Sequence, residues 1–166
     1  FLEHLQMVAL SLTLGTLLTA LMLLVCIHWP SLAAPLISVS GVLFTIPSLA
    51  MFILLLPWTG LSSSTAVIGL TLYSLLILMR NVLAGMQKLP EDILESARAL
   101  GYTRFGRFIE IDIFLNLPSL LAGLRISAVT LVALVLVTAL IGQGGLGPLM
   151  IVGFRHTFLT PILLSP

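Results

Sequence analysis

The chain has 166 residues, of which 59% are hydrophobic and only 8% are charged, and its formal net charge is +1. Soluble domains carry about 25% charged residues, so this composition argues against a soluble enzyme. The low net charge also excludes a strongly basic nucleic-acid-binding protein. An integral membrane protein, with the lipid bilayer as its surroundings, is the class that remains.

The apolar runs predict an all-α membrane protein, because a helix needs about 20 apolar residues to cross a bilayer. We treat residues 1–166 as one transmembrane domain with about five helices. The predicted spans are 5–27, 36–57, 65–84, 118–141 and 157–166, the last of them incomplete. The sequence starts without a methionine and stops inside an apolar run, so we expect further sequence beyond both ends.

The charges are concentrated in one central segment. Eleven of the thirteen charged residues lie between Arg80 and Arg125, and only Glu3 and Arg155 lie outside that range. Because short cytoplasmic loops are enriched in Lys and Arg, the loop 85–117 is predicted to be cytoplasmic. Alternation then places residues 28–35 inside, and the N-terminus of the chain, 58–65 and 142–156 outside.

The central loop is predicted to form two short amphipathic helices. Pro90 suits a first helical position, Gly101 a left-handed terminator, and Thr103 an N-cap of the second helix. The apolar positions fall on one face of each helix: Ile93, Leu94, Ala97 and Leu100, then Phe105, Phe108 and Ile109. These faces either pack back on the membrane bundle or form a docking surface for a cytoplasmic protein, and periodicity alone favours neither.

The residues of this loop resemble the EAA loop of binding-protein-dependent ATP-binding-cassette importers. The family pattern is Glu-Ala-Ala, three residues, Gly, nine residues, and then Ile-x-Leu-Pro. The matching residues are Glu95, Ala97, Gly101 and Ile111. Ser96 replaces the first Ala, Ile113 and Phe114 stand where the family has Leu-Pro, and Pro118 supplies a later proline that many members carry.

Further strings resemble the branch of this family that imports osmoprotectants such as glycine betaine, carnitine and choline. They are Thr45 to Ala50, Leu72 to Leu76, Leu121 to Arg125 and Ala139 to Gly147, and their order and spacing carry the resemblance. The resemblance implies the type I importer permease fold and a multi-pass protein of the prokaryotic plasma (inner) membrane.

The resemblance also implies a division of labour. This chain and a second permease subunit, identical or different, would form the pathway, and an extracytoplasmic binding protein would deliver the solute. Cytoplasmic ATPase subunits would bind the ATP and Mg²⁺, so this chain is expected to hold no cofactor and to be no enzyme. The residues implied in ATPase coupling are Glu95, Ser96, Ala97, Arg98, Leu100 and Gly101.

Several other residues have competing interpretations. Arg125, two turns into the fourth span, can snorkel to the interface, pair with Glu110 or Asp112, or contact the solute. The loop containing Gly142, Gly144, Gly145 and Gly147 lacks the Lys-Ser/Thr of a phosphate-binding loop, so we expect a helix break in an outer re-entrant connection. No catalytic or metal-binding set is predicted, and His4, His28 and His156 are expected to be isolated interfacial residues.

Other classes of protein remain as alternatives. A permease of the same superfamily for another small solute, such as an amino acid, fits the same motifs. A secondary transporter or channel would place carboxylates within its spans, and the predicted spans contain none. A scaffold that recruits a cytoplasmic partner fits the composition, whereas an intramembrane protease lacks the paired catalytic residues.

Overall fold

The computed structural model describes residues 1–156, and every regular element in that part of the chain is helical. This result confirms the all-α prediction, while the predicted span 157–166 lies outside the described residues. The elements are α1 (Leu2–His28), η1 (Pro30–Leu32), α2 (Ala33–Thr45), α3 (Ser48–Thr59), α4 (Ser63–Met86), α5 (Glu91–Ala99), α6 (Arg104–Arg107), the π-helix η2 (Phe108–Asp112), α7 (Ile113–Leu115), α8 (Leu117–Val137), η3 (Thr138–Ile141) and α9 (Gly147–His156).

Three helices within residues 1–156 are long and apolar enough to cross a bilayer. They are α1, α4 and the run Leu117–Ile141, which joins α8 to η3. They cover the predicted spans 5–27, 65–84 and 118–141. A bent pair, Pro30–Thr45 with Ser48–Thr59, makes a fourth candidate if it counts as one span. The expected total of about five spans stays a prediction.

The predicted span 36–57 is not one continuous helix, because α2 and α3 meet at a bend of 101°. Pro47 has no amide hydrogen, and its ring forces the preceding residue out of the helical region. Ile46 is accordingly extended, with φ −67° and ψ 127°. The Tyr73 hydroxyl of α4 donates to the freed carbonyl of Ile46, which satisfies a group that lipid could not. Pro47 therefore breaks the helix rather than kinking it.

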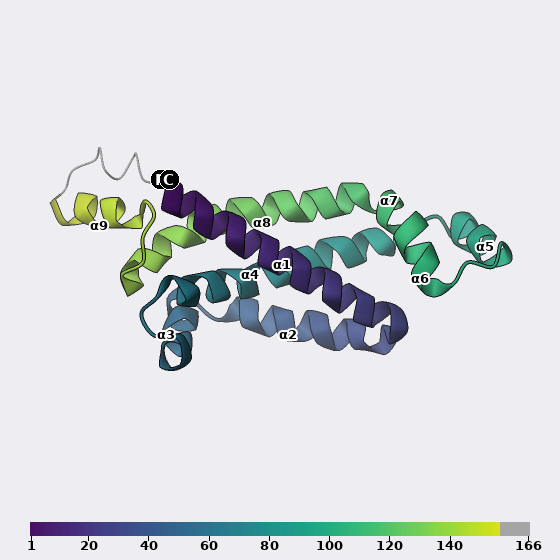
Figure 1. Cartoon of the computed structure of the whole chain (residues 1–166), viewed down its shortest axis with the longest axis horizontal. Coiled ribbons are helices and arrows are strands. Elements are labelled where there is room, and N and C mark those ends of the chain that lie inside the picture. Colours follow the sequence, from purple (N-terminus) through teal and green to yellow (C-terminus); the bar gives the residue numbers. More distant parts are fainter. Residues whose placement is uncertain (157–166) are drawn as a thin grey trace.

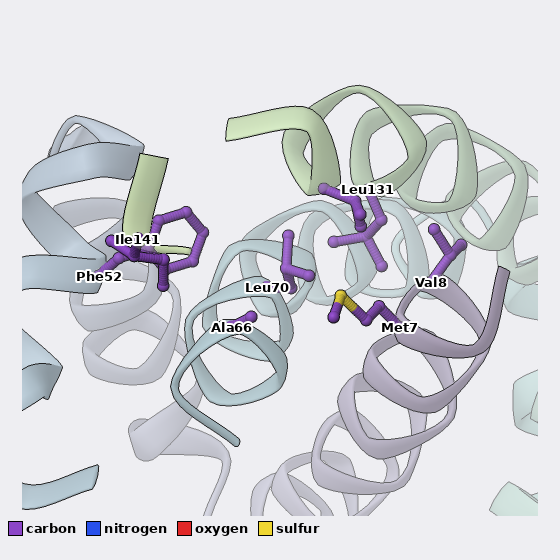
Figure 2. Close-up of a cluster of buried hydrophobic side chains, with 8 residues drawn as sticks. Met7, Val8, Phe52, Ala66, Leu70, Leu131 and Ile141 are labelled. Atoms are coloured by element: carbon purple, nitrogen blue, oxygen red, sulfur yellow. The ribbon is translucent and has the colours of Figure 1, made fainter. Parts of the chain in front are cut away.

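Helix α4 lies at the centre of the bundle and packs against α1, α2, α3 and α8 (Figure 1). Within the apolar windows of the helices, 67% of α4 is buried but only 28% of α1 and of the Leu117–Ile141 run. One apolar cluster joins α1, α3, α4, α8 and η3, and Figure 2 shows its side chains converging around α4. Its buried members are Met7, Val8, Phe52, Ala66, Leu70, Leu131, Val135 and Ile141.

Small residues allow the helices to approach α4 closely. A β-carbon added to Gly15 of α1 would collide with the Ser74 hydroxyl of α4. A β-carbon at Gly123 of α8 would lie 3.0 Å from the Asn81 β-carbon of α4. Gly123 belongs to the small-residue row Ser119, Gly123, Ser127, which therefore packs within this chain against α4. Such small-residue contacts are a main source of helix association in membranes.

The closest contact of this kind ties the end of α4 to the start of α8. The buried Asn116 donates through Nδ2 to the carbonyl of Val82, at 2.8 Å. Gly85 faces both Asn116 and Ser119, whose side chains fill the space that a β-carbon would need. The loop between α4 and α8 thus leaves and rejoins the bundle at one point.

Replacing Gly85 with alanine is expected to destabilise the protein, whereas the same change at Gly41 of α2 is not. Both changes gain about 1 kcal/mol of helix propensity. At Gly85 the methyl group would collide with Asn116, and overpacking costs about 1–3 kcal/mol. At Gly41 the nearest atom, Leu76 Cδ1, is 3.9 Å away. Thermal unfolding in detergent should give a lower Tm for Gly85→Ala only; equal Tm values for both variants would contradict this packing.

Candidate functional site

The polar loop between α4 and α8 projects from one end of the bundle, opposite the end that carries α3 and α9 (Figure 1). It holds α5, α6, η2 and α7 in chain order. The sequence predicted two short helices here, and the structure gives α5 followed by a nearly continuous helical run from Arg104 to Leu115. No proline stands at positions 113–114, where the EAA loop has Leu-Pro, and the helix continues through Leu115 to a break at Asn116.

Helix α5 begins and ends where its sequence dictates, apart from one position. Pro90 is the N-cap, with ψ 129°, so the first helical residue is Glu91 rather than the predicted Pro90. At the other end Gly101 has φ 84°, in the left-handed region that glycine tolerates. The Gly101 amide donates to the carbonyl of Arg98 and the Tyr102 amide to that of Ala97, at 3.0 and 3.1 Å. These two bonds form a Schellman motif, which fixes the direction in which the chain leaves α5.

The six residues implied in coupling lie together on α5 and its C-terminal turn. Ala97 is buried, at 2% exposure. Glu95, Ser96, Arg98, Leu100 and Gly101 are exposed. Leu100 was expected on the same apolar face as Ala97, but α5 ends at Ala99 and the Leu100 side chain is 78% exposed. A leucine this exposed at the tip of a helix is available to a partner surface.

The charged side chains of α5 form no ion pair with other described residues of the chain. The i, i+3 spacing of Glu95 and Arg98 would allow them to pair. Among the described side chains, those of residues 1–154, the one ion pair closer than 4.0 Å instead joins Arg107 Nε to Asp112 Oδ2, at 3.2 Å. Asp112 was also a candidate partner of Arg125, and this bond assigns it to Arg107 instead. Glu95 and Arg98 are therefore presented to the surroundings as an exposed pair of opposite charges.

Of the three predicted apolar residues in the second half of the loop, only Phe108 packs against the membrane helices. Thr103 Oγ1 accepts the Gly106 amide at 3.0 Å, which confirms the predicted N-cap. Phe108 is buried at 6% exposure, in a cluster with Leu23 of α1 and Met79 and Val82 of α4. Phe105 and Ile109, expected beside it, are 50% and 41% exposed. Ile109 lies in the π-helix Phe108–Asp112, whose wider turn shifts the helical register.

The remaining predicted residues of α8 lie at its start and on its outer face. Pro118 is in the first turn of α8, where a missing amide hydrogen is tolerated. Arg125 is exposed and borders a shallow groove with Ala122, Ile126 and Val129. It makes no ion pair within the described part of the chain, so the structure does not show the predicted pairing with Glu110 or Asp112.

The glycine loop after η3 is fastened to the first turn of α1. Gly142 and Gly145 have φ 74° and 84°, so each needs glycine's freedom. The Gly145 amide donates to Glu3 Oε2 at 3.3 Å. The Leu146 amide donates to His4 Nδ1 at 3.4 Å.

Sequence reasoning missed this contact and took His4 for an isolated interfacial residue, whereas the structure buries it at 2% exposure. Its Nε2 lies 3.1 Å from the carbonyl of Val132, which can only accept, so Nε2 donates and Nδ1 is left to accept from Leu146. Glu3 gave the one signal, as the only charged residue before Arg80.

The other two predicted glycines of this loop give room to neighbours. A β-carbon at Gly144 would collide with the Glu3 carboxylate, and one at Gly147 would lie 2.5 Å from Ala139 Cβ. The four glycines therefore allow a tight connection between η3 and α9 that closes over the start of α1. No phosphate-binding arrangement is needed to explain them.

Comparison with known proteins places this geometry in a family. Residues 30–162 match the family model described as "Binding-protein-dependent transport system inner membrane component". The chain is 35% identical over 138 residues to the choline transport system permease protein OpuBD of Bacillus subtilis, covering 83% of this chain and 61% of that protein.

Two further relatives show the same relationship. The carnitine transport permease protein OpuCB of Listeria monocytogenes is 33% identical over 76% of this chain and 58% of its own length. The osmoprotectant import permease protein OsmW of Salmonella typhimurium is 32% identical over 91% of this chain and 73% of its own length. The chain thus spans about three fifths of the choline and carnitine permeases and more of OsmW. With the family model matching most of its residues, the chain belongs to the inner membrane components of binding-protein-dependent transport systems.

Proposed function

We propose that this chain is the permease subunit of an ATP-driven importer that carries small osmoprotectants across the plasma membrane. Family membership supports the class of protein, and the relatives named for choline, carnitine and osmoprotectant transport support the solute. The observation that carries the mechanism is the exposed C-terminal turn of α5, with Leu100 at its tip. The loop that bears it faces the cytoplasm, and the N-terminus of this chain lies outside.

In this proposal the work is divided among subunits. Two permease subunits form the pathway, a binding protein delivers the solute from outside, and two cytoplasmic ATPase subunits bind ATP and Mg²⁺ and hydrolyse the nucleotide. Helix α5 fits against the ATPase through Leu100, with Glu95 pairing with a basic group on its surface.

Movement of α5 reaches the membrane through the root of the loop. When ATP closes the ATPase pair, α5 moves, and the helical run from Arg104 to Leu115 carries that motion to Asn116. Asn116 is bonded to Val82, so α4 and α8 are displaced together. Because α4 is the central helix, its displacement rearranges the bundle between inward-facing and outward-facing states.

A secondary transporter or channel is the weaker candidate. The family match and the named relatives describe permeases of binding-protein-dependent systems, and no Asp or Glu lies between His4 and Pro90 to couple ions within the spans. A different solute is the stronger rival. A protein of Helicobacter pylori named for ergothioneine transport is 39% identical over 68% of this chain and 20% of its own length.

Replacing Leu100 with glutamate is expected to weaken ATPase binding by about tenfold or more, as for a buried anchor residue at an interface. Because the side chain is 78% exposed, the Tm of the permease alone should not change. The matched control is Leu61→Glu, at 72% exposure in the connection at the opposite end of α4. Co-purification of the ATPase in detergent is the measurement. Equal recovery with wild type and Leu100→Glu would show that this turn does not dock.

The solute is tested by uptake in a strain that lacks its other osmolyte importers. Cells that express the complete system should accumulate labelled glycine betaine, carnitine or choline, and unlabelled competitors should rank the three. Labelled ergothioneine and a neutral amino acid serve as the comparison solutes. Transport of one of these, with no uptake of the three quaternary amines, would remove the osmoprotectant assignment and leave the importer assignment standing.

A further inference from the structure

A cavity of about 610 Å³ lies between the root of the polar loop and the adjoining ends of α1 and α4. Small-molecule sites are typically about 300–1,000 Å³, so it has room for a ligand group. Its inner wall is apolar and comes from the last turns of the two spanning helices, with Leu23 and Ile27 of α1 and Leu83 and Met86 of α4. An occupant must therefore be apolar on the side that faces the bilayer.

The outer wall of the same cavity is cationic. Arg98 of α5 and Arg104 and Arg107 of α6 line it, together with the single acidic residue Asp112. Arg107 is bonded to Asp112, which leaves Arg98 and Arg104 with no ion-pair partner among residues 1–156. Two guanidinium groups beside an apolar wall favour an anion that carries a hydrophobic tail.

A second observation points to a ligand with hydrogen-bond donors. Asp112 is buried at 5% exposure, and its Oδ1 has no hydrogen-bond partner within the described residues, although Oδ2 is bonded to Arg107. A buried carboxylate oxygen without a donor is costly, and most such atoms in proteins are paired. Asp112 is one of the residues that line the cavity, and a hydroxyl group of an occupant would supply the donor that Oδ1 lacks.

We propose that this cavity binds an anionic phospholipid of the cytoplasmic leaflet whose headgroup carries hydroxyl groups, phosphatidylglycerol being the simplest. Its phosphodiester lies against Arg98 and Arg104, a headgroup hydroxyl donates to Asp112 Oδ1, and an acyl chain follows the apolar wall. Basic pockets between helices on the cytoplasmic side are typical sites for anionic headgroups. The leaflet rests on the orientation in the proposed function, whereas the binding chemistry does not.

The site has a consequence for the loop, because it bridges the membrane and the coupling residues. Arg98 belongs to α5, Arg104 begins α6, and the apolar wall belongs to α1 and α4. A lipid held by both walls ties α5 to the bilayer surface and restricts its movement relative to the bundle. A soluble anion would bind the arginines without covering the apolar wall, so the lipid is the occupant that satisfies the whole cavity.

The test uses the full-length permease purified with its ATPase from bilayers that contain three lipids with the same acyl chains. These are phosphatidylglycerol, phosphatidylmethanol, which has the same phosphodiester charge without the hydroxyls, and zwitterionic phosphatidylcholine. Native mass spectrometry counts the lipids retained after transfer to detergent. We expect retention in the order phosphatidylglycerol, phosphatidylmethanol, phosphatidylcholine, and equal retention of all three would overturn the proposal.

Two variants and a matched control locate the bound lipid. Arg98→Gln and Arg104→Gln should each weaken retention of phosphatidylglycerol about fivefold, the contribution of one basic residue near an anionic membrane surface. Arg80→Gln removes the same charge from an exposed position of α4 outside the cavity and should leave retention unchanged. Thermal unfolding of each variant confirms that it is folded.

Three results contradict the site. Unchanged retention in Arg104→Gln, or an equal loss in Arg80→Gln, would show that bound lipid is only annular. Loss of the ATPase from Arg104→Gln with phosphatidylglycerol still bound would assign the cavity to the ATPase interface. The lipid count needs neither ATP nor solute, so a failure here leaves the Leu100 experiment and the uptake assay to judge the proposed function separately.

Discussion

The close packing of α1 and α8 on α4 is the interaction on which the rest of this structure depends. In lipid the hydrophobic effect does little to hold helices together, so contact must come from shape. Glycines at positions 15, 85 and 123 remove the side chains that would keep the helices apart. Helix α4 consequently has 67% of its apolar window buried, more than twice the share of α1 or α8.

The same packing sets the position of the polar loop. The Asn116 amide and Gly85 hold the start of α8 against the end of α4, so the thirty or so residues between them extend from one point of the bundle. Phe108, buried in a cluster with residues of α1 and α4, holds the loop against the bundle, and Leu100 is left exposed. A loop anchored at its root and exposed at its tip can transmit a push from a partner to the membrane helices.

Periodicity and composition predicted most of the architecture, and tertiary contacts explain what they missed. Long apolar runs, Gly101 and Thr103 are local signals, and the structure has the expected helices and caps at those places. The sequence predicted one span over 36–57, whereas the structure divides it at Pro47. The break is tolerated because the Tyr73 hydroxyl of another helix donates to the carbonyl that the break leaves free. No neighbour in sequence signals that contact.

The candidate site was recognised from a motif, while its geometry required the fold. The pattern around Glu95 and Gly101 indicated the loop, but nothing in it places Leu100 outside the helix or gives Asp112 to Arg107. The His4 contact with Leu146 joins residues 142 positions apart, a separation that helical periodicity cannot report. Long-range polar contacts are set by packing, so they become visible only when the helices are assembled.

The orientation of the polar loop is tested most directly by labelling a single cysteine. In a Cys26→Ser background, which removes the only cysteine of residues 1–166, Ser96→Cys places an exposed thiol on α5, and Ser63→Cys provides the control at the opposite end of α4. A membrane-impermeant maleimide should label the α5 thiol in inside-out vesicles only and the control thiol in intact cells. Labelling of the α5 thiol in intact cells would place the loop outside and contradict its role as the ATPase contact.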